Sequence, residues 1–197
     1  MAKHSGKPLE TAWKNLRPMT KEFLETAFHE KNYHLAKVRF SFDAHADWEI
    51  GKLLAALDKE VETNRFKIAC GKTLYGLAEI CAQILESRTS SAETFIQLAT
   101  RAIKRNNYAG IDRLADILLT RFTAAEIAEI IRQSELVQIR AIAFETLALF
   151  PVKSIEVLVR DPLYFEIGSA VLDQQYTEFE VEEAGKLLEE LTPNSLF

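Results

Sequence analysis

The sequence predicts an all-α protein that contains a stack of short helical hairpins, and three observations support this fold class. The 197 residues include only 7 Gly and 5 Pro, which disfavours a loop-rich or all-β fold. Between residues 91 and 175, apolar residues recur with a period of 28, and helix-breaking residues recur at the same spacing. The recurring apolar sets are Ala99, Ile127 and Ile155; Ala102, Ile130 and Leu158; and Ile111, Ile139 and Ile167.

The helix-breaking residues distinguish hairpins from one long helix. A period of 28 is four heptads, so a continuous amphipathic helix would produce the same apolar repeat. Residues 106–107 (Asn-Asn), Ser134 and residues 161–162 (Asp-Pro) interrupt the three units, each near its middle. Because proline cannot continue a helix interior, each unit is predicted to contain a helix of about ten residues, a turn and a second helix of about twelve.

Residues that favour helix starts stand at the beginning of each unit. Thr123 opens the second unit and is followed three residues later by Glu126, which is the spacing of a capping box. Ser90 and Glu93 have the same spacing at the start of the first unit, and Pro151 opens the third. These residues predict where the first helix of each hairpin begins.

Residues 135–147, with the sequence ELVQIRAIAFETL, resemble the second helix of a HEAT repeat, and residues 64–74 resemble it more weakly. In that helix an apolar residue precedes an Arg, and Ala and Leu follow on the packing face. The resemblance implies a right-handed α–α superhelix of short helical hairpins. Two departures stand out: the position of Arg140 is occupied by Asp112 and Gly168 in the other units, and the family's Pro in the first helix is absent. The resemblance transfers no functional residue, because one fold serves many functions.

The predicted organisation is a flexible N-terminal arm followed by a single all-helical domain. The arm covers residues 1–18, which are polar, and the domain covers residues 19–197. Within the domain we expect a larger N-terminal helical hairpin at 19–89, three repeat units at 90–178, and a capping helix with a tail at 179–197.

Local patterns predict the helices of the N-terminal region and leave one segment open. Thr20 is expected to cap a first helix, and Asp47 a second. A third helix, apolar on more than one side, is expected at about residues 66–85. Residues 33–46 could form either a helix followed by an extended linker or a strand, and we favour the linker because a lone strand has no pairing partner.

The charge distribution disfavours a general nucleic-acid binder. The formal net charge is −5, and residues 161–197 alone contain one Lys and nine Asp or Glu. A nucleic-acid-binding face needs clustered positive charge to collect phosphates, whereas this chain has an acidic end and a nearly neutral body. A local basic stripe remains compatible with the composition.

The sequence also indicates a cytoplasmic protein. It contains no apolar run of about 18 residues, so we expect no membrane contact, and its first residues lack the apolar core of a secretory signal. Cys70 and Cys81 fall in one predicted helix, where eleven residues span about 16 Å, too far for a disulfide. Two unpaired thiols favour a reducing compartment.

A row of basic residues is the first candidate binding site. Lys104, Arg132 and Arg160 occupy one position of the repeat, at the C-terminal end of each predicted first helix, and Arg101 and Arg105 lie near its start. One interpretation is that these cations only complement the negative helix ends. The other is a groove for an acidic peptide, for a phosphate backbone, or for the acidic C-terminal region of a second copy of this chain.

Two terminal segments are candidate docking sites. Leu9, Trp13 and Leu16 share one helical face, which could either lie against the first helices or dock on another chain. Leu196 and Phe197 follow the last predicted helix, and could either fold back onto the stack or contact a neighbouring molecule.

One cluster has the residue types of a metal site. His29, His34, Asp43, His45 and Asp47 lie within 19 residues, and both imidazole and carboxylate bind metals. However, residues five apart on a helix point about 140° away from each other, so the two leading histidines would not share a face. Helix caps and surface polar groups are the alternative interpretation.

These observations predict a non-enzymatic scaffold of the helical-repeat type that binds another protein, with no cofactor and no catalytic residue. A second copy of the chain is the other candidate partner. The alternative function is DNA binding or repair, as in the HEAT-like alkylpurine DNA glycosylases, and it would require clustered Lys and Arg around an exposed aromatic residue. The two indoles, Trp13 and Trp48, both lie outside the repeats. A helical metalloprotein built on the histidine cluster is the third hypothesis.

Overall fold

The computed structural model describes residues 7–32, 34, 40–63 and 68–191. Every regular element in these ranges is an α-helix, which confirms the all-α fold class. The chain divides into two compact units, Met1–Leu98 (unit 1) and Ala99–Phe197 (unit 2), each described below by itself. Within the described ranges, no helix combines the length and the apolar character needed to cross a membrane.

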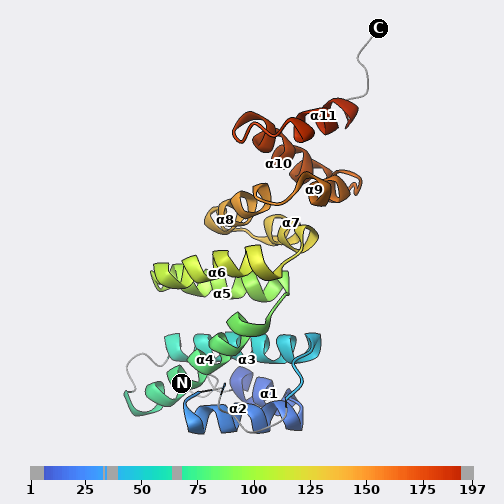
Figure 1. The fold of residues 1–197 in the computed structure, drawn as a ribbon. Coiled ribbons are helices and arrows are strands. Elements are labelled where there is room, and N and C mark those ends of the chain that lie inside the picture. Colours follow the sequence, from blue (N-terminus) through green and yellow to red (C-terminus); the bar gives the residue numbers. More distant parts are fainter. Residues whose placement is uncertain (1–6, 33, 35–39, 64–67, 192–197) are drawn as a thin grey trace. The chain divides into compact units, whose positions relative to one another are not determined.

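Unit 1 is built around a pair of long helices. It contains α1 (Lys7–Asn15), α2 (Pro18–Glu30), α3 (Ala44–Thr63), α4 (Ile68–Arg88) and the first half of α5 (Ala92–Lys104). α3 packs along α4, while α1 packs on α3 and α2 on α4 (Figure 1). Leu24, Leu53 and Leu57 are completely buried, as expected of the apolar faces that these helices present to one another.

Two predicted caps of unit 1 are wrong, because both helices begin earlier than the sequence pattern indicated. α2 starts at Pro18, whose fixed φ suits the first helical position, so Thr20 lies inside the helix and is buried. α3 is capped by Asp43, whose Oδ1 accepts a hydrogen bond of 2.7 Å from the backbone N–H of Ala46. Asp47 lies one turn further on and is buried as well.

The open segment at 33–46 is described only in part. Residues 33 and 35–39 lie outside the described residues. From Phe40 to Asp43 the chain has no regular structure, and the ring of Phe40 stacks on that of Phe23 with centroids 4.4 Å apart. This stacking ties the approach to α3 back onto α2.

The helices of unit 2 begin and end where the repeat predicts. They are the end of α5, then α6 (Tyr108–Arg121), α7 (Ala124–Gln133), α8 (Val137–Ala148), α9 (Val152–Val159), α10 (Phe165–Thr177) and α11 (Glu182–Leu191). The three predicted breaks all fall between helices, at residues 106–107, Ser134 and residues 161–162. At the first break Asn106 adopts a left-handed conformation (φ 52°), which asparagine tolerates better than most residues.

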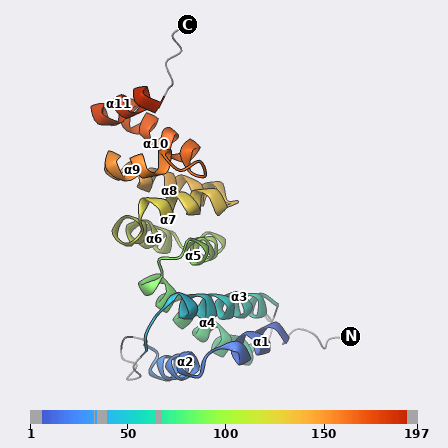
Figure 2. The same cartoon turned by 90° about the vertical axis from the view of Figure 1, so that its right-hand side faces the viewer.

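Like helices of successive hairpins pack against one another. Inside the hairpins, α7 packs with α8, and α9 with α10. Between hairpins, second helices contact second helices (α6 with α8, and α8 with α10), and first helices contact first helices (α7 with α9) (Figure 2). α11 continues this series by contacting α9. Ile127, Ile139 and Ile155, all members of the recurring apolar sets, are completely buried. Two of the recurring sets are buried throughout, Ala99 with Ile127 and Ile155, and Ala102 with Ile130 and Leu158, whereas only Ile139 of the third set is buried. At two positions of the repeat, the period of 28 therefore corresponds to a repetition of buried residues.

The predicted caps of the repeats are confirmed at Thr123 and displaced at Ser90. The Thr123 hydroxyl accepts a hydrogen bond from the Glu126 backbone N–H, and the Glu126 carboxylate accepts one from the Thr123 N–H, which completes the capping box. At the start of α5 it is Ser91, not Ser90, whose hydroxyl accepts from the backbone N–H of Thr94. Adjacent serines satisfy the same local pattern, so the sequence alone could not separate them.

Candidate functional site

The basic row follows the ends of the first helices of unit 2. Lys104 and Arg132 lie in the last turns of α5 and α7, and Arg160 is the residue that follows α9. All three are exposed. Arg101 and Arg105, at the start of the row, are half-buried.

Two of the three row residues form ion pairs within their own hairpin. Arg132 binds both carboxylate oxygens of Glu129, at 2.6 and 2.7 Å, and Arg160 pairs with Glu156. The hydroxyl of Tyr164 donates to Glu129 at 3.0 Å, so the turn between α9 and α10 lies against the end of α7. Arg132 and Arg160 are therefore partly neutralised cations at the ends of α7 and α9.

The hydrogen bonds from Arg132 are the main reason why the pKa of Glu129 falls from its ordinary value near 4.5 to about 2. Burial opposes this shift, whereas the hydrogen bonds from Gln133 and Tyr164 lower the pKa further. A carboxylate with a lowered native pKa stabilises the fold above its unfolded-state pKa and loses that contribution as the pH falls through the native value.

This shift predicts a pH-dependent contribution of Glu129 to stability. At pH 6, the Glu129→Gln variant should unfold at a urea concentration lower than wild type by about 0.3 M, a small difference because solvent reaches both members of the pair and screens their interaction. Between pH 4.5 and pH 2 the difference should shrink towards zero, since wild-type Glu129 then becomes neutral as well. Urea titrations at pH 6, 4 and 2 measure it, and a difference that is constant across this range would contradict the assignment.

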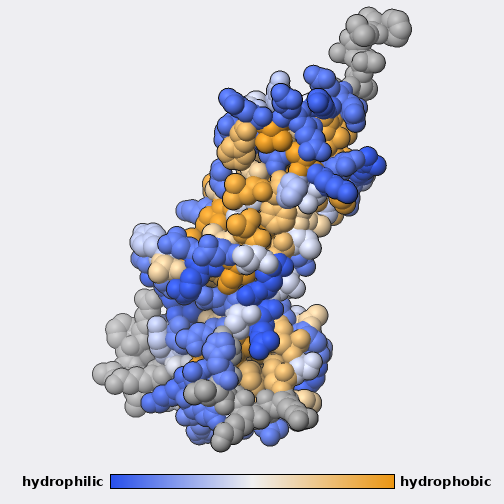
Figure 3. Space-filling model, in the orientation of Figure 1, coloured by the Kyte–Doolittle hydropathy of each residue, from blue (hydrophilic) through white to orange (hydrophobic). Residues whose placement is uncertain are grey.

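Large apolar side chains are exposed three to five residues after each cation of the basic row. Tyr108 (71% exposed), Val137 (65%) and Phe165 (41%) begin the second helices α6, α8 and α10, and Leu163 (56%) precedes α10. We call the three row residues and these four apolar residues the turn edge. Figure 3 shows apolar side chains gathered over unit 2 around the position of α8. The sequence pattern predicts the cations of this edge but not its apolar half, because a period of 28 does not by itself show which apolar residues stay exposed.

The predicted docking residues at the N-terminus lie in a packed helix. Residues 7–15 of the predicted flexible arm form α1, which packs on α3. Leu9 and Trp13 are half-buried and Leu16 is 4% exposed, so this face is largely covered inside unit 1. Leu196 and Phe197 lie outside the described residues.

The predicted metal cluster is not assembled among the residues that the structure describes, where no group of three or more His, Cys, Asp or Glu side chains could hold a metal. His29 and His34 are exposed near the end of α2. Asp43 pairs with a guanidinium, and His45 Nε2 lies 3.5 Å from a carboxylate oxygen of Glu49.

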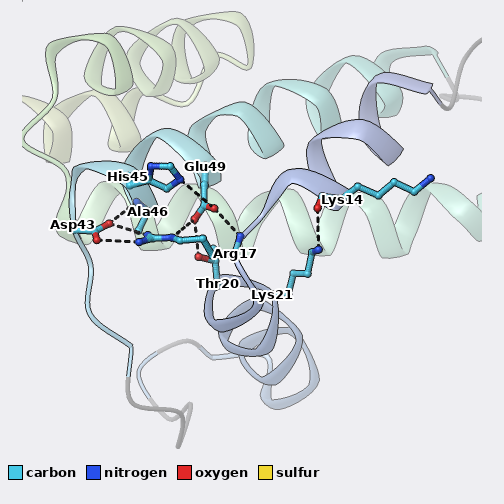
Figure 4. A network of polar contacts seen from close by, with 8 residues as sticks. All are labelled: Lys14, Arg17, Thr20, Lys21, Asp43, His45, Ala46 and Glu49. Carbon is cyan, nitrogen blue, oxygen red and sulfur yellow. Dashed lines mark hydrogen bonds and ion pairs between the residues drawn. The ribbon is translucent and has the colours of Figure 1, made fainter.

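A polar network that sequence analysis did not identify joins the start of α2 to α3 (Figure 4). The Glu49 side chain is 1% exposed and accepts three hydrogen bonds: from the Arg17 backbone N–H (2.6 Å), from Arg17 Nε (3.0 Å) and from the Thr20 hydroxyl (2.7 Å). The same guanidinium donates to both oxygens of Asp43, at 2.8 and 3.0 Å. Burial alone would raise the pKa of Glu49, but the hydrogen bonds from Thr20 and Arg17 outweigh it and lower the pKa. The network ties the start of α2 to α3.

Unit 1 also contains a pocket of about 700 Å³ between α3 and the beginning of α5. Asp47 and Trp48 line it from α3, and Glu93 and Thr94 line it from α5. Asp47 is 5% exposed, and its Oδ2 accepts a hydrogen bond of 2.8 Å from the Thr94 hydroxyl. Trp48 is 50% exposed. The sequence predicts Asp47 only as a cap or a metal ligand, because its partner Thr94 lies 47 residues away.

No protein-family profile, curated protein or solved structure matches this chain. The candidate sites therefore rest on their own geometry: the turn edge of unit 2, which offers cations beside exposed apolar groups, and the pocket of unit 1, which offers a buried carboxylate beside an indole.

Proposed function

We propose that this protein is a non-enzymatic interaction module of the helical-repeat type, and that the turn edge of unit 2 binds an acidic amphipathic segment of a partner protein. The observation that carries this proposal is the pairing, in each of three successive hairpins, of one basic residue with at least one exposed apolar residue. A single exposed leucine or tyrosine is ordinary on a protein surface, whereas a row of them rimmed by charge is characteristic of interaction sites.

The proposed architecture of unit 2 is a short HEAT-like superhelix. The like-on-like contacts between α6, α8 and α10 and between α7, α9 and α11 support it. In such a stack the starts of the second helices follow one another at nearly constant spacing, so an extended or helical segment can contact several of them at once. The partner's apolar side chains would cover Tyr108, Val137 and Phe165, where burial contributes roughly 25 cal/mol per Å².

The charges of the edge favour an acidic partner. Carboxylates of the bound segment would meet Lys104 directly, and would compete with or extend the pairs of Arg132 and Arg160. Exposed charges of this kind contribute more to association rate and to the choice of partner than to affinity. Binding is therefore expected to weaken as salt concentration rises.

Site-specific photo-crosslinking tests the location of the site. A photoreactive amino acid at Val137 should capture a partner segment from native lysate, whereas one at the exposed Lys153, at the other end of the third hairpin's first helix, should not. Mass spectrometry identifies the captured segment, which should carry net negative charge and an amphipathic pattern. Equal capture at both positions would contradict the proposal.

Charge reversal tests the basic row. The triple variant Lys104→Glu, Arg132→Glu and Arg160→Glu should bind the captured segment at least about tenfold more weakly, because each change replaces attraction by repulsion. The matched control reverses Arg121, Lys153 and Lys186, three exposed residues of unit 2 that lie in the last turn of α6, the first turn of α9 and α11, and should retain wild-type affinity.

Circular dichroism must show that both triple variants are folded, and titration calorimetry compares their dissociation constants. If both variants lose affinity equally, the row is only a source of general electrostatic attraction and the proposed site is wrong.

Retention of the wild-type protein on heparin would favour the nucleic-acid alternative, and a captured segment from this same chain would identify the partner as a second copy.

A further inference from the structure

An acidic segment with exposed aromatic side chains joins α10 to α11 at the end of unit 2 (Figure 1). It covers residues 176–183, which have the sequence YTEFEVEE, and we call it the acidic turn. Its four carboxylates are all exposed, and within the described part of the chain none of them forms an ion pair. Tyr176 is 51% exposed and Phe179 is 45% exposed. The acidic turn therefore has both properties expected of a segment that binds the turn edge.

A purely structural role explains the carboxylates of the acidic turn but not all of its apolar groups. A helix that closes a stack needs a polar outer face to stay soluble, and Glu182 and Glu183 also suit the positive end of α11. The ring of Tyr176 lies over Gly185. Phe179 stands between two exposed glutamates, where neither solubility nor the helix end calls for an aromatic ring.

The two ends of unit 2 carry opposite charge. Between Glu93 and Asp112 the sequence contains three basic residues and no acidic one, whereas between Arg160 and Lys186 it contains seven acidic residues and no basic one. The basic stretch surrounds the turn from α5 to α6, where Lys104 is exposed and forms no ion pair with another described residue. This part of the turn edge and the acidic turn are therefore complementary in charge.

The two surfaces cannot meet within one molecule. The hydrogen bond between Tyr164 and Glu129 places the start of α10 at the turn edge, and the acidic turn follows the other end of that helix. A helix of 13 residues spans about 20 Å, so the acidic turn lies about that far from the nearest part of the turn edge in its own chain. A contact between the two surfaces needs two copies.

We propose that the turn edge of one copy binds the acidic turn of a second copy. Carboxylates of the acidic turn pair with Lys104, and the ring of Phe179 covers Tyr108, which is 71% exposed. This inference rests on the proposed function of the turn edge and names the partner as this protein itself. Because the two surfaces differ, a dimer still offers one unoccupied turn edge and one unoccupied acidic turn, and copies add until a ring closes.

Sedimentation velocity tests whether the protein associates with itself. The average mass of the wild type should rise above that of the monomer between about 5 and 500 µM, the range expected of a small and partly polar contact. It should fall back towards the monomer in about 0.5 M NaCl, because ions screen the pairing of charges.

Substitutions in the acidic turn test which segment is bound. The acidic-turn variant should remain monomeric at every concentration; it carries Glu178→Gln, Phe179→Ser, Glu180→Gln and Glu182→Gln. The matched control makes the same kinds of change at exposed positions of unit 1 and should associate as the wild type does; it carries Glu22→Gln, Glu25→Gln, Glu62→Gln and Met19→Ser. If circular dichroism shows the acidic-turn variant to be unfolded, Phe179→Ser alone replaces it, with association weakened about tenfold.

A mixture of two variants tests whether the contact joins two different surfaces. The edge variant, with Lys104, Arg132 and Arg160 all changed to Glu, keeps its acidic turn, and the acidic-turn variant keeps its turn edge. Each should be monomeric alone. An equimolar mixture should form a complex of one copy of each and nothing larger, because each copy then has a single intact surface.

A photoreactive amino acid at Val137 in the purified protein locates the contact. When this protein is mixed with wild type labelled with heavy nitrogen, mass spectrometry should find it crosslinked to a labelled peptide from residues 176–183. The label shows that the peptide comes from a second copy.

The outcomes separate this inference from the proposed function. A wild type that stays monomeric at about 500 µM, an acidic-turn variant that associates like the wild type, or a mixture that stays monomeric would overturn the inference. Capture of another protein's acidic segment at Val137, with a monomeric wild type, would overturn the inference but support the proposed function. Self-association that the edge variant retains in full would contradict both.

Discussion

Replacing Glu49 by alanine is expected to destabilise unit 1 by about 2–4 kcal/mol, because the change removes the acceptor of three hydrogen bonds in a nearly dry site. The Thr20 hydroxyl, which is completely buried, and the Arg17 backbone N–H would both lose their partner. Arg17 would keep its bonds to Asp43, which limits the loss. Urea unfolding followed by circular dichroism measures the difference.

Two further variants show whether the effect comes from the buried network. Glu49→Gln retains one acceptor oxygen, so it should lose only about half as much stability. The remaining loss arises because its amide group turns an N–H donor towards the donors of Arg17. Glu10→Ala removes the carboxylate of an exposed ion pair on α1, in which Glu10 Oε1 lies 2.5 Å from Lys14 Nζ. This change should not measurably alter stability. A loss at Glu10 as large as at Glu49 would mean that net charge, and not the network, determines stability here.

Gly168→Ala is expected to destabilise unit 2 by about 1–2 kcal/mol, although alanine normally favours a helix by about 0.5–1 kcal/mol over glycine. A Cβ at position 168 would lie 2.8 Å from Val159 Cγ1 and 3.1 Å from the Val159 backbone nitrogen. Val159 is 5% exposed and β-branched, so its side chain has little freedom to move. α9 and α10 would have to separate, and thermal unfolding should detect the loss.

Gly185→Ala is the matched control for this prediction. The new Cβ would be even closer to a neighbour, at 2.6 Å from the ring of Tyr176. That ring is 51% exposed, however, and can rotate into solvent at little cost. Gly185→Ala should therefore unfold at the wild-type temperature or above it, and a greater loss at Gly185 than at Gly168 would contradict this account of the packing.

The residues equivalent to Gly168 in the other two hairpins show which features of the structure the sequence repeat predicts. Asp112 and Arg140 occupy the same position of the other hairpins and remain exposed or half-buried. Only in the third hairpin, where the first helix has eight residues, does the second helix approach so closely that a side chain would clash. The period predicts the order of the helices and not the distance between them.

What the sequence determined by itself is the succession of helices in unit 2 and the positions of their breaks. The capping box at Thr123 and the turn at Pro162 act through neighbours within four residues, so their effects can be read from local spacing. The buried apolar positions follow from helical periodicity for the same reason.

Only the tertiary structure decided which polar residues form sites. Asp43 and Asp47 have nearly equivalent local surroundings, yet one caps α3 and pairs with Arg17, while the other is buried against Thr94 from α5. Glu49 became a buried acceptor because α2 folds back onto it. Such roles arise from contacts between residues 26 to 47 positions apart, and the burial that sets their charge and hydrogen bonding exists only once the helices have packed.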